Sequence, residues 1–131
     1  MKLTVYSHNK FYKTFSHWRV DKEYADTMFN YLVYSYNPGS FFTSVLANDF
    51  ADAVARSHPS NTIPALKNLT GWIRDHVPPP ARGSYQAVKI WEQVSDAHRR
   101  VMLEDMRLIY TEEEEIMMTL RGDTTEETVL Y

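Results

Sequence analysis

One stretch of the sequence, residues 37–60 (NPGSFFTSVLANDFADAVARSHPS), limits most strongly what this chain can fold into. Its Pro-Gly pair suits the two central positions of a type II turn, and Ser40 can cap a helix that follows the turn. Pro59 prevents that helix from continuing, because proline has no backbone N–H to donate. The stretch therefore predicts one helix over residues 41–57.

The faces of this predicted helix differ in polarity when its residues are placed 100° apart around the axis. The side expected to face the core carries Phe42, Leu46, Phe50, Ala53 and Val54. The polar side carries Asn48, Asp49, Asp52 and Arg56, together with the apolar Phe41 and Val45. Two interpretations of the polar side are open. It can hold an exposed ion pair of little energetic consequence, or its residues can line a pocket or contact a partner.

The composition indicates a chain that can form a hydrophobic core but has no cysteine chemistry. The sequence has 131 residues, of which 44% are hydrophobic, and this argues against global disorder. It has no cysteine, so disulfides and thiolate metal sites are excluded. No apolar run approaches the roughly 18 residues of a membrane span, and we expect no signal peptide.

The expected fold class is mainly α, a compact bundle of about five helices with a short N-terminal β-hairpin. Alternating polar and apolar residues favour two strands over residues 1–20, with a turn near Asn9. Apolar residues then recur at helical spacing as far as residue 122. We therefore expect a single helical domain over residues 1–122 and a flexible tail over residues 123–131.

The hairpin is rich in aromatic residues that could meet another molecule, including a second copy of the chain in a homo-oligomer. The expected partner-interface residues are Tyr12, Phe15, Trp18, Phe41 and Val45. Residues 1–22 hold five cations and one acid, whereas residues 104–131 hold nine acids and two arginines. Such a dipolar chain can associate head to tail, but five cations are too few to favour nucleic-acid binding.

Three local patterns carry further expectations. Gly71 within a predicted helix indicates a close backbone approach, and the triple proline after that helix predicts a short extended spacer. Thr111 and Glu114 have the spacing of a helix capping box. The acidic run at residues 112–115 suits the positive end of a helix, and a metal site or a partner patch is the alternative.

A search for catalytic motifs finds none with a clear physical mechanism. There is no phosphate loop, no serine elbow and no His-Glu-x-x-His, and the five histidines lack metal-ligand spacing. The enzyme alternative is a small hydrolase, for which the candidate residues are Asp49, Asp52 and His58. We expect no catalytic residue, no metal and no cofactor.

The run YSYNPGSFFTSVLANDFADAVARSHPSN, followed by a tryptophan-bearing helix, a proline break and GSYQAVKIW, resembles a group of small proteins encoded by tailed bacteriophages. Members share a Pro-Gly-Phe-like turn, an apolar run that ends in Asn-Asp, a downstream Asn, and a Gly-Ser-led helix that carries Trp. The resemblance covers residues 34–91. Ser40 stands where a second glycine is common in the group.

This resemblance implies a protein made in the cytoplasm of an infected bacterium. We expect an accessory binding protein that inhibits a host or defence factor, either by binding a host protein or by sequestering a small nucleotide-like ligand. The turn at Ser40 and the helix start at Ser84 offer backbone N–H groups to an anion such as phosphate. The expected ligand-binding residues are Ser40, Asn48, Asp49, Arg56, Asn61, Arg82 and Ser84. The alternative is a structural or assembly protein of the virion or the replication machinery.

Overall fold

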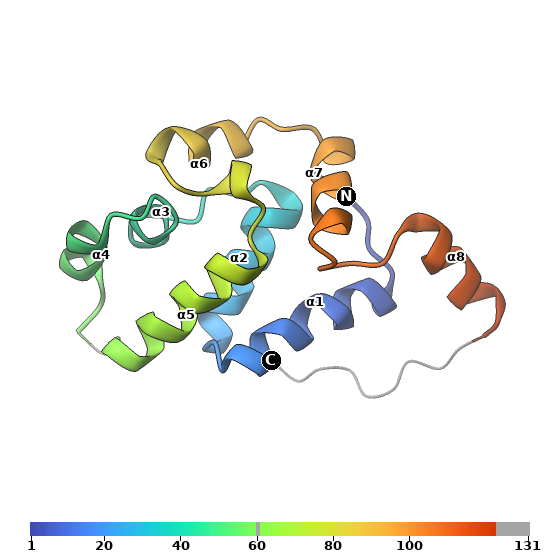
Figure 1. Cartoon of the computed structure of the whole chain (residues 1–131), viewed down its shortest axis with the longest axis horizontal. Coiled ribbons are helices and arrows are strands. Elements are labelled where there is room, and N and C mark those ends of the chain that lie inside the picture. The colour runs from blue at the N-terminus through green and yellow to red at the C-terminus, as the bar shows by residue number, and fades with distance from the viewer. Residues whose placement is uncertain (60, 123–131) are drawn as a thin grey trace.

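The computed structural model describes residues 1–59 and 61–122, and over these ranges the chain forms eight α-helices and no β-strand (Figure 1). The mainly helical prediction is therefore confirmed, although the helices are shorter and more numerous than expected. The predicted tail lies outside the described residues. The helices are α1 (Val5–Trp18), α2 (Lys22–Tyr34), α3 (Ser40–Leu46), α4 (Phe50–Arg56), α5 (Ile63–His76), α6 (Tyr85–Trp91), α7 (Asp96–Asp105) and α8 (Glu112–Leu120).

The predicted N-terminal hairpin is wrong, because residues 5–18 form the helix α1. Thr4 caps this helix by accepting the N–H of Ser7, and the helix ends where Arg19 adopts a left-handed φ of 53°. Phe11 and Phe15, four residues apart, are both fully buried on its inner face. Burial against α2 and α5 outweighs the β-propensity of these aromatic residues, which depends strongly on context.

The core lies where α1, α2 and α5 meet, and α6 and α7 close it (Figure 1). Trp72 of α5 is fully buried, stacks on Phe15 with ring centroids 4.4 Å apart, and donates its indole N–H to Thr14 Oγ1 at 2.8 Å. Trp91 of α6 is equally buried and donates its indole N–H to the Tyr31 carbonyl at 3.0 Å. Both indoles therefore bury their rings without leaving a polar atom unpaired.

Gly71 lies on α5 where that helix meets the ring of Trp18 at the end of α1. A Cβ atom added at Gly71 would overlap this ring. The predicted close approach is confirmed, and the neighbour is the indole of Trp18. The triple proline also differs from expectation, since Pro79–Ala81 form a 3₁₀ turn, η1, rather than an extended spacer.

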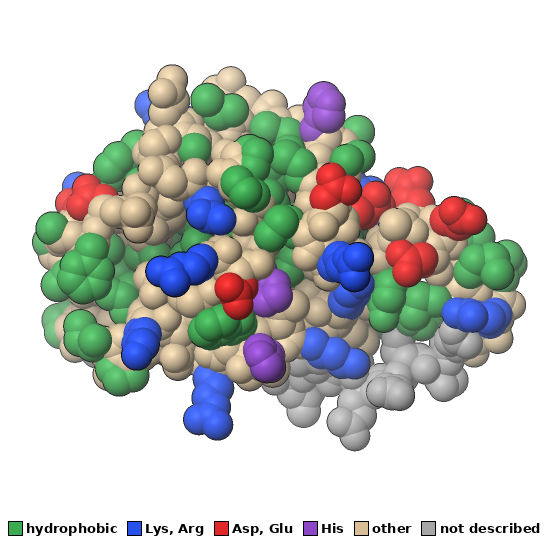
Figure 2. Space-filling model, viewed as in Figure 1, with side chains coloured by type: hydrophobic (Ala, Val, Ile, Leu, Met, Phe, Trp, Pro, Cys, Tyr) green, Lys and Arg blue, Asp and Glu red, His purple; other side chains and the backbone are tan. Residues whose placement is uncertain are grey.

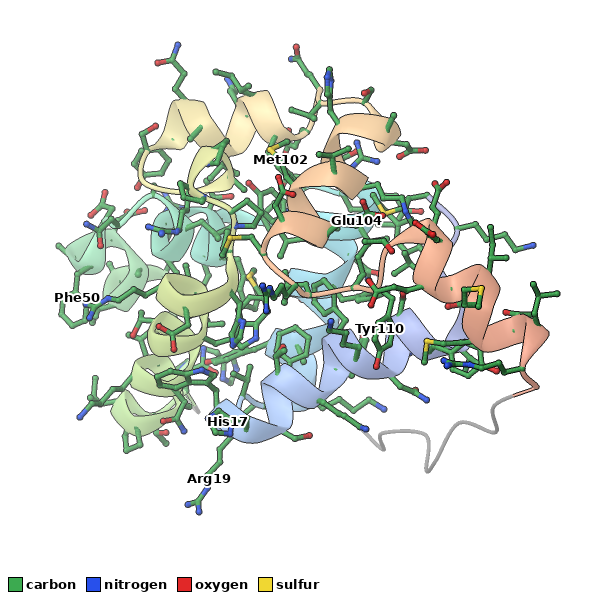
Figure 3. All side chains as sticks on the ribbon, turned by 45° about the vertical axis from the view of Figure 1, so that its right-hand side comes forward. His17, Arg19, Phe50, Met102, Glu104 and Tyr110 are labelled. Atoms are coloured by element: carbon green, nitrogen blue, oxygen red, sulfur yellow. The ribbon has the colours of Figure 1, made fainter. Side chains whose placement is uncertain are left out.

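The two ends of the described chain are joined by a buried polar cluster. Arg100 of α7 pairs with Glu115 of α8, and both side chains are buried. Glu104, on the side of α7 that faces α8, also contacts Arg100, at 2.9 Å (Figure 3). Thr4 donates its N–H and its hydroxyl to Glu115 at 3.1 and 2.6 Å. The hydrogen bonds from Thr4 and the ion pair with Arg100 therefore hold α8 against the start of α1 and against α7.

The acidic run at the start of α8 divides into two roles. The predicted capping box is confirmed, because Thr111 accepts the N–H of Glu114 and Glu114 accepts the N–H of Thr111. Glu115 is instead buried against α1 and α7. Burial alone would raise the pKa of the Glu115 carboxyl, but hydrogen bonds from Ser7 and Thr4 and the pairing with Arg100 hold that pKa below its usual value.

Candidate ligand-binding site

The site is built on a break in the central predicted helix. Asn48 adopts a left-handed φ of 65°, and Asp49 caps α4 by accepting the N–H of Asp52 at 3.1 Å. Asparagine tolerates this conformation and aspartate favours the cap position, which explains the break. As a result α4 turns away from the core and leaves Phe50 and Val54 exposed, by 65% and 42%. The prediction that these two face the core is wrong.

The start of α3 also differs slightly from expectation. Gly39, with a φ of 86°, occupies the cap position, and Ser40 is the first residue of the helix. The N–H of Gly39 donates to Asn37 Oδ1 at 2.8 Å, which stabilises the turn. Glycine is therefore required here for its backbone conformation.

A network of hydrogen bonds ties α3, α4 and α6 together. The hydroxyl of Tyr85 lies 2.7 Å from Asp49 Oδ2 and 3.2 Å from Asp52 Oδ2. The buried hydroxyl of Ser44 donates to Asp52, and Arg56 Nε donates to the same carboxylate oxygen at 2.8 Å. These groups line a surface cavity of about 450 Å³, which we call the tyrosine–carboxylate cavity.

The electrostatics of this network disfavour an anionic ligand. The hydrogen bond from Ser44 and the pairing with Arg56 hold the pKa of the Asp52 carboxyl below its usual value. Ser44 lowers the pKa of the Tyr85 hydroxyl, but the hydrogen bond to Asp49, burial and the two carboxylates raise it overall. The cavity therefore presents two negative charges to one arginine. We interpret the network as an attachment of α4 to α6 and α3.

A second cavity, of about 480 Å³, opens on the other side of Arg56. We call it the aromatic cavity, and its lining residues are Glu23, Tyr24, Thr27, Phe41, Phe42, Arg56, His58 and Asn61. The rings of Tyr24, Phe41 and Phe42 contact one another with centroids 5.0–5.9 Å apart. Arg56, His58 and Asn61 add polar groups from α4 and the segment after it. The cavity thus combines an aromatic wall with several polar groups.

Tyr24 brings an unusual feature to this cavity. The residue is 95% buried, and its hydroxyl has no hydrogen-bond partner among the residues that the structure describes. Burial, together with the charges of Asp21 and Glu23, raises the pKa of this hydroxyl. A buried polar group without a partner costs about 1–3 kcal/mol, so most proteins pair such groups.

A third cavity, of about 240 Å³, lies between α3, α5 and the segment before α6. We call it the arginine cavity, because Arg74 and Arg82 both line it, together with Asn48. It shares no lining residue with the aromatic cavity. The predicted ligand residues therefore do not form one site.

The seven predicted ligand residues are spread over the three cavities, and one of them lines none. Arg56 and Asn61 line the aromatic cavity, and Arg56 also lines the tyrosine–carboxylate cavity with Ser40 and Asp49. Asn48 and Arg82 line the arginine cavity. Ser84 caps α6 by accepting the N–H of Ala87 and lines none of the three. The hydrolase candidates are separated, since His58 lines the aromatic cavity and the two aspartates line its neighbour.

The predicted interface residues are mostly internal. Tyr12, Phe15 and Val45 are buried in the core, so the prediction that they meet a partner is wrong for these three. Tyr12 donates its hydroxyl to Asp26 at 2.8 Å. Trp18 and Phe41 are half-buried and pack against the core. The predicted interface depended on an exposed hairpin that this chain does not form.

Sequence reasoning missed the residues that other elements supply to the site. Tyr24 and Phe42 line the aromatic cavity, and Tyr85 joins the carboxylate network. Tyr24 comes from α2, and its position beside α3 depends on tertiary packing. The Asn-Asp pair was the one available signal, because it marks a helix break that places α4 against α6.

Two further properties of the described residues bear on function. Within residues 1–59 and 61–122, no three His, Asp or Glu side chains lie close enough to hold a metal ion. No helix in the described part of the chain combines the length and apolar character that crossing a membrane requires.

Comparisons of the chain with protein-family models, with curated proteins and with solved structures gave no match.

Proposed function

We propose that this protein is a binding protein that holds a small nucleotide-like ligand in the aromatic cavity. The observation that carries this proposal is an aromatic wall of Tyr24, Phe41 and Phe42 beside an arginine. The buried hydroxyl of Tyr24 has no hydrogen-bond partner among the described residues. In an infected bacterial cell, as the phage resemblance implies, such a protein would inhibit a host or defence process by sequestering the ligand.

The aromatic wall suits a flat ring. Phe41 and Phe42 are half-buried, so their rings are accessible from the cavity as well as packed on the core. Stacking of a base on an aromatic side chain contributes about 1–3 kcal/mol. The volume of about 480 Å³ lies within the range of small-molecule sites, roughly 300–1,000 Å³.

The polar groups suit the remainder of such a ligand. Arg56 uses Nε to bind Asp52, and its two terminal nitrogens make no hydrogen bond among the described residues. A guanidinium held in this way can donate both terminal nitrogens to a phosphate. Glu23 and Asn61 line the same cavity and can accept N–H groups of a base.

The first experiment is native mass spectrometry of the protein purified gently from bacterial cells. A retained mass of nucleotide size would support sequestration, and the subunit count would test the expected homo-oligomer. Binding is then measured by NMR titration with adenosine 5′-monophosphate as the probe. We expect amide shifts centred on Tyr24, Phe41, Phe42, Arg56 and Asn61. Shifts confined to other regions would refute the assignment of the site.

Two matched variants test the role of Arg56. Arg56→Ala should weaken binding of the probe by about tenfold or more, the effect of one lost charge-assisted hydrogen bond. Its melting temperature should hardly change, because the ion pair with Asp52 is exposed. Lys67→Ala removes one exposed cation of α5 that lines none of the cavities and should bind normally. Equal losses in both variants would indicate non-specific charge attraction.

Tyr24→Phe gives a sharper test, because stability and affinity should move in opposite directions. Removing an unpaired buried hydroxyl should stabilise the free protein by about 1 kcal/mol. The same change should lower the affinity for the probe, because the ligand loses the Tyr24 hydroxyl as a hydrogen-bond partner. A stabilised variant with unchanged affinity would show that the hydroxyl takes no part in binding.

A specific observation favours a second candidate, inhibition by binding a host protein. Phe50 and Val54 lie four residues apart on α4 and are exposed, and Phe50 is at the outer edge of the molecule (Figure 3). Large exposed aromatic residues are frequent anchors of protein interfaces. Phe50→Ser should abolish capture of a host protein from infected cells while leaving the ligand titration unchanged. Unchanged capture would refute this candidate.

A further inference from the structure

The arginine cavity carries a concentration of positive charge that the fold itself does not neutralise. Arg74, near the end of α5, and Arg82, just after η1, line one cavity of about 240 Å³. Among the residues that the structure describes, no aspartate or glutamate lines it. Figure 2 shows basic side chains over α5 and beside the turn that follows it.

Neither arginine has an ion-pair partner among the residues that the structure describes. The ion pairs within the described residues involve the N-terminal amine, Arg56, Arg99 and Arg100, and neither cavity arginine takes part. Asp75 follows Arg74 directly on α5, so it projects about 100° away around the helix. Both cations border one cavity, and an anion bound there would offset the charge of both.

Arg82 is also held in place before any ligand arrives. Its Nε donates to the Val77 carbonyl at 3.2 Å, which uses one of five donors and leaves the terminal nitrogens for another group. Its backbone segment is fixed to α3, since the N–H of Gly83 donates to the Leu46 carbonyl at 2.8 Å. A guanidinium anchored by its own side chain and backbone loses little freedom on binding.

We propose that the arginine cavity is a binding site for the phosphoryl group of a small phosphate ester. Two guanidinium forks match the charge and the oxygen geometry of a phosphate dianion better than those of a carboxylate. Asn48 and Thr70 add neutral hydrogen-bonding side chains to the lining.

The rest of the lining indicates what the phosphate is attached to. Val45, Leu46 and Ile73 are buried apolar residues that also border the cavity. They suit a small apolar group on the ester oxygen. The volume is below the roughly 300 Å³ at which sites for drug-sized molecules begin, so a compact ester fits better than a full nucleotide.

Binding is tested by NMR titration of the full chain with phenyl phosphate, inorganic phosphate and benzoate. We expect amide shifts at Asn48, Thr70 and Gly83, with phenyl phosphate binding most tightly because it adds apolar contact. Benzoate should bind at least about tenfold more weakly, since it carries one charge and two oxygens. Equal binding of benzoate and phenyl phosphate would overturn the phosphoryl assignment.

Variants identify the residues that bind. Arg74→Ala should weaken the binding of phenyl phosphate by about tenfold or more, because a charge-assisted hydrogen bond is lost. The fold should be unaffected, because Arg74 is exposed and its loss does not disturb the core. Arg82→Lys keeps one charge but loses the fork, and it should also weaken binding. Lys67→Ala is the control on the same helix and should bind like the original chain. Normal affinity in Arg74→Ala would overturn the proposal, as would an equal loss in Lys67→Ala.

Discussion

Neutralising Glu115 should strongly destabilise this protein, although the residue lies in a run of acids that looks like a solvated helix start. Glu115→Gln keeps the shape of the side chain and removes its charge. In the folded chain Glu115 accepts two hydrogen bonds from Thr4 and pairs with the buried Arg100. The variant leaves the Arg100 charge buried with less compensation.

The size of the effect follows from what Arg100 retains. Removing one partner of a buried ion pair usually costs about 3–5 kcal/mol, because an uncompensated charge stays buried. Arg100 keeps Glu104 at 2.9 Å, so we expect the smaller loss of about 2–3 kcal/mol. Each kcal/mol lowers the melting temperature of a domain of this size by about 4 °C, which gives a drop of about 8–12 °C.

Urea denaturation followed by circular dichroism measures this loss as a change in the free energy of unfolding. Glu113→Gln is the matched control, because Glu113 is an exposed neighbour in the same turn of α8. The control should change stability little, since surface substitutions away from such clusters have small effects. Equal stability of the two variants would refute the argument that the Arg100–Glu115 pair joins α8 to the rest of the fold.

Two further predictions concern pH and a close contact. The pKa values of four carboxyl groups lie below their usual range in the folded protein, those of Asp52, Asp96, Glu114 and Glu115. The contribution of these carboxylates to stability is fully present above their unfolded pKa of about 4, and it is lost as the pH falls through their pKa values in the folded protein. The free energy of unfolding should therefore fall most steeply below about pH 4. A flat profile between pH 5 and pH 3 in urea titrations would contradict this. Gly71→Ala should destabilise the protein by about 1–3 kcal/mol, because the added methyl group overlaps the ring of Trp18. In a Trp18→Ala background the same change should stabilise the protein by up to about 1 kcal/mol, because alanine favours a helix more than glycine does. Thermal unfolding of the four proteins of this double-mutant cycle measures both effects.

The parts of the fold that sequence could predict are those decided by local chemistry. Thr62, Ser84, Ser95 and Thr111 each cap a helix by accepting a nearby backbone N–H, as their residue types favour. For residues 5–18 the same reasoning predicted strands instead of the helix α1, because aromatic residues suit a strand and a buried helix equally well. Only packing against α2 and α5 distinguishes the two.

The candidate site was predictable to a similar extent. Arg56, Asn61 and Phe41 were expected to have a binding role, and the structure brings them to one cavity. Tyr24 was not expected there, because nothing in the sequence places α2 beside the segment after α4. The left-handed Asn48 could have been inferred from the Asn-Asp pair, but the apolar pattern of the stretch favoured an unbroken helix.

The positions of the tryptophans have a practical consequence for optical measurements. Trp72 and Trp91 are fully buried, Trp18 packs against α5, and none of the three lines any of the cavities described above. Intrinsic fluorescence should therefore report unfolding of the core while remaining nearly silent to a ligand in either proposed site. An emission change on adding a ligand would mean that the helices of the core have moved.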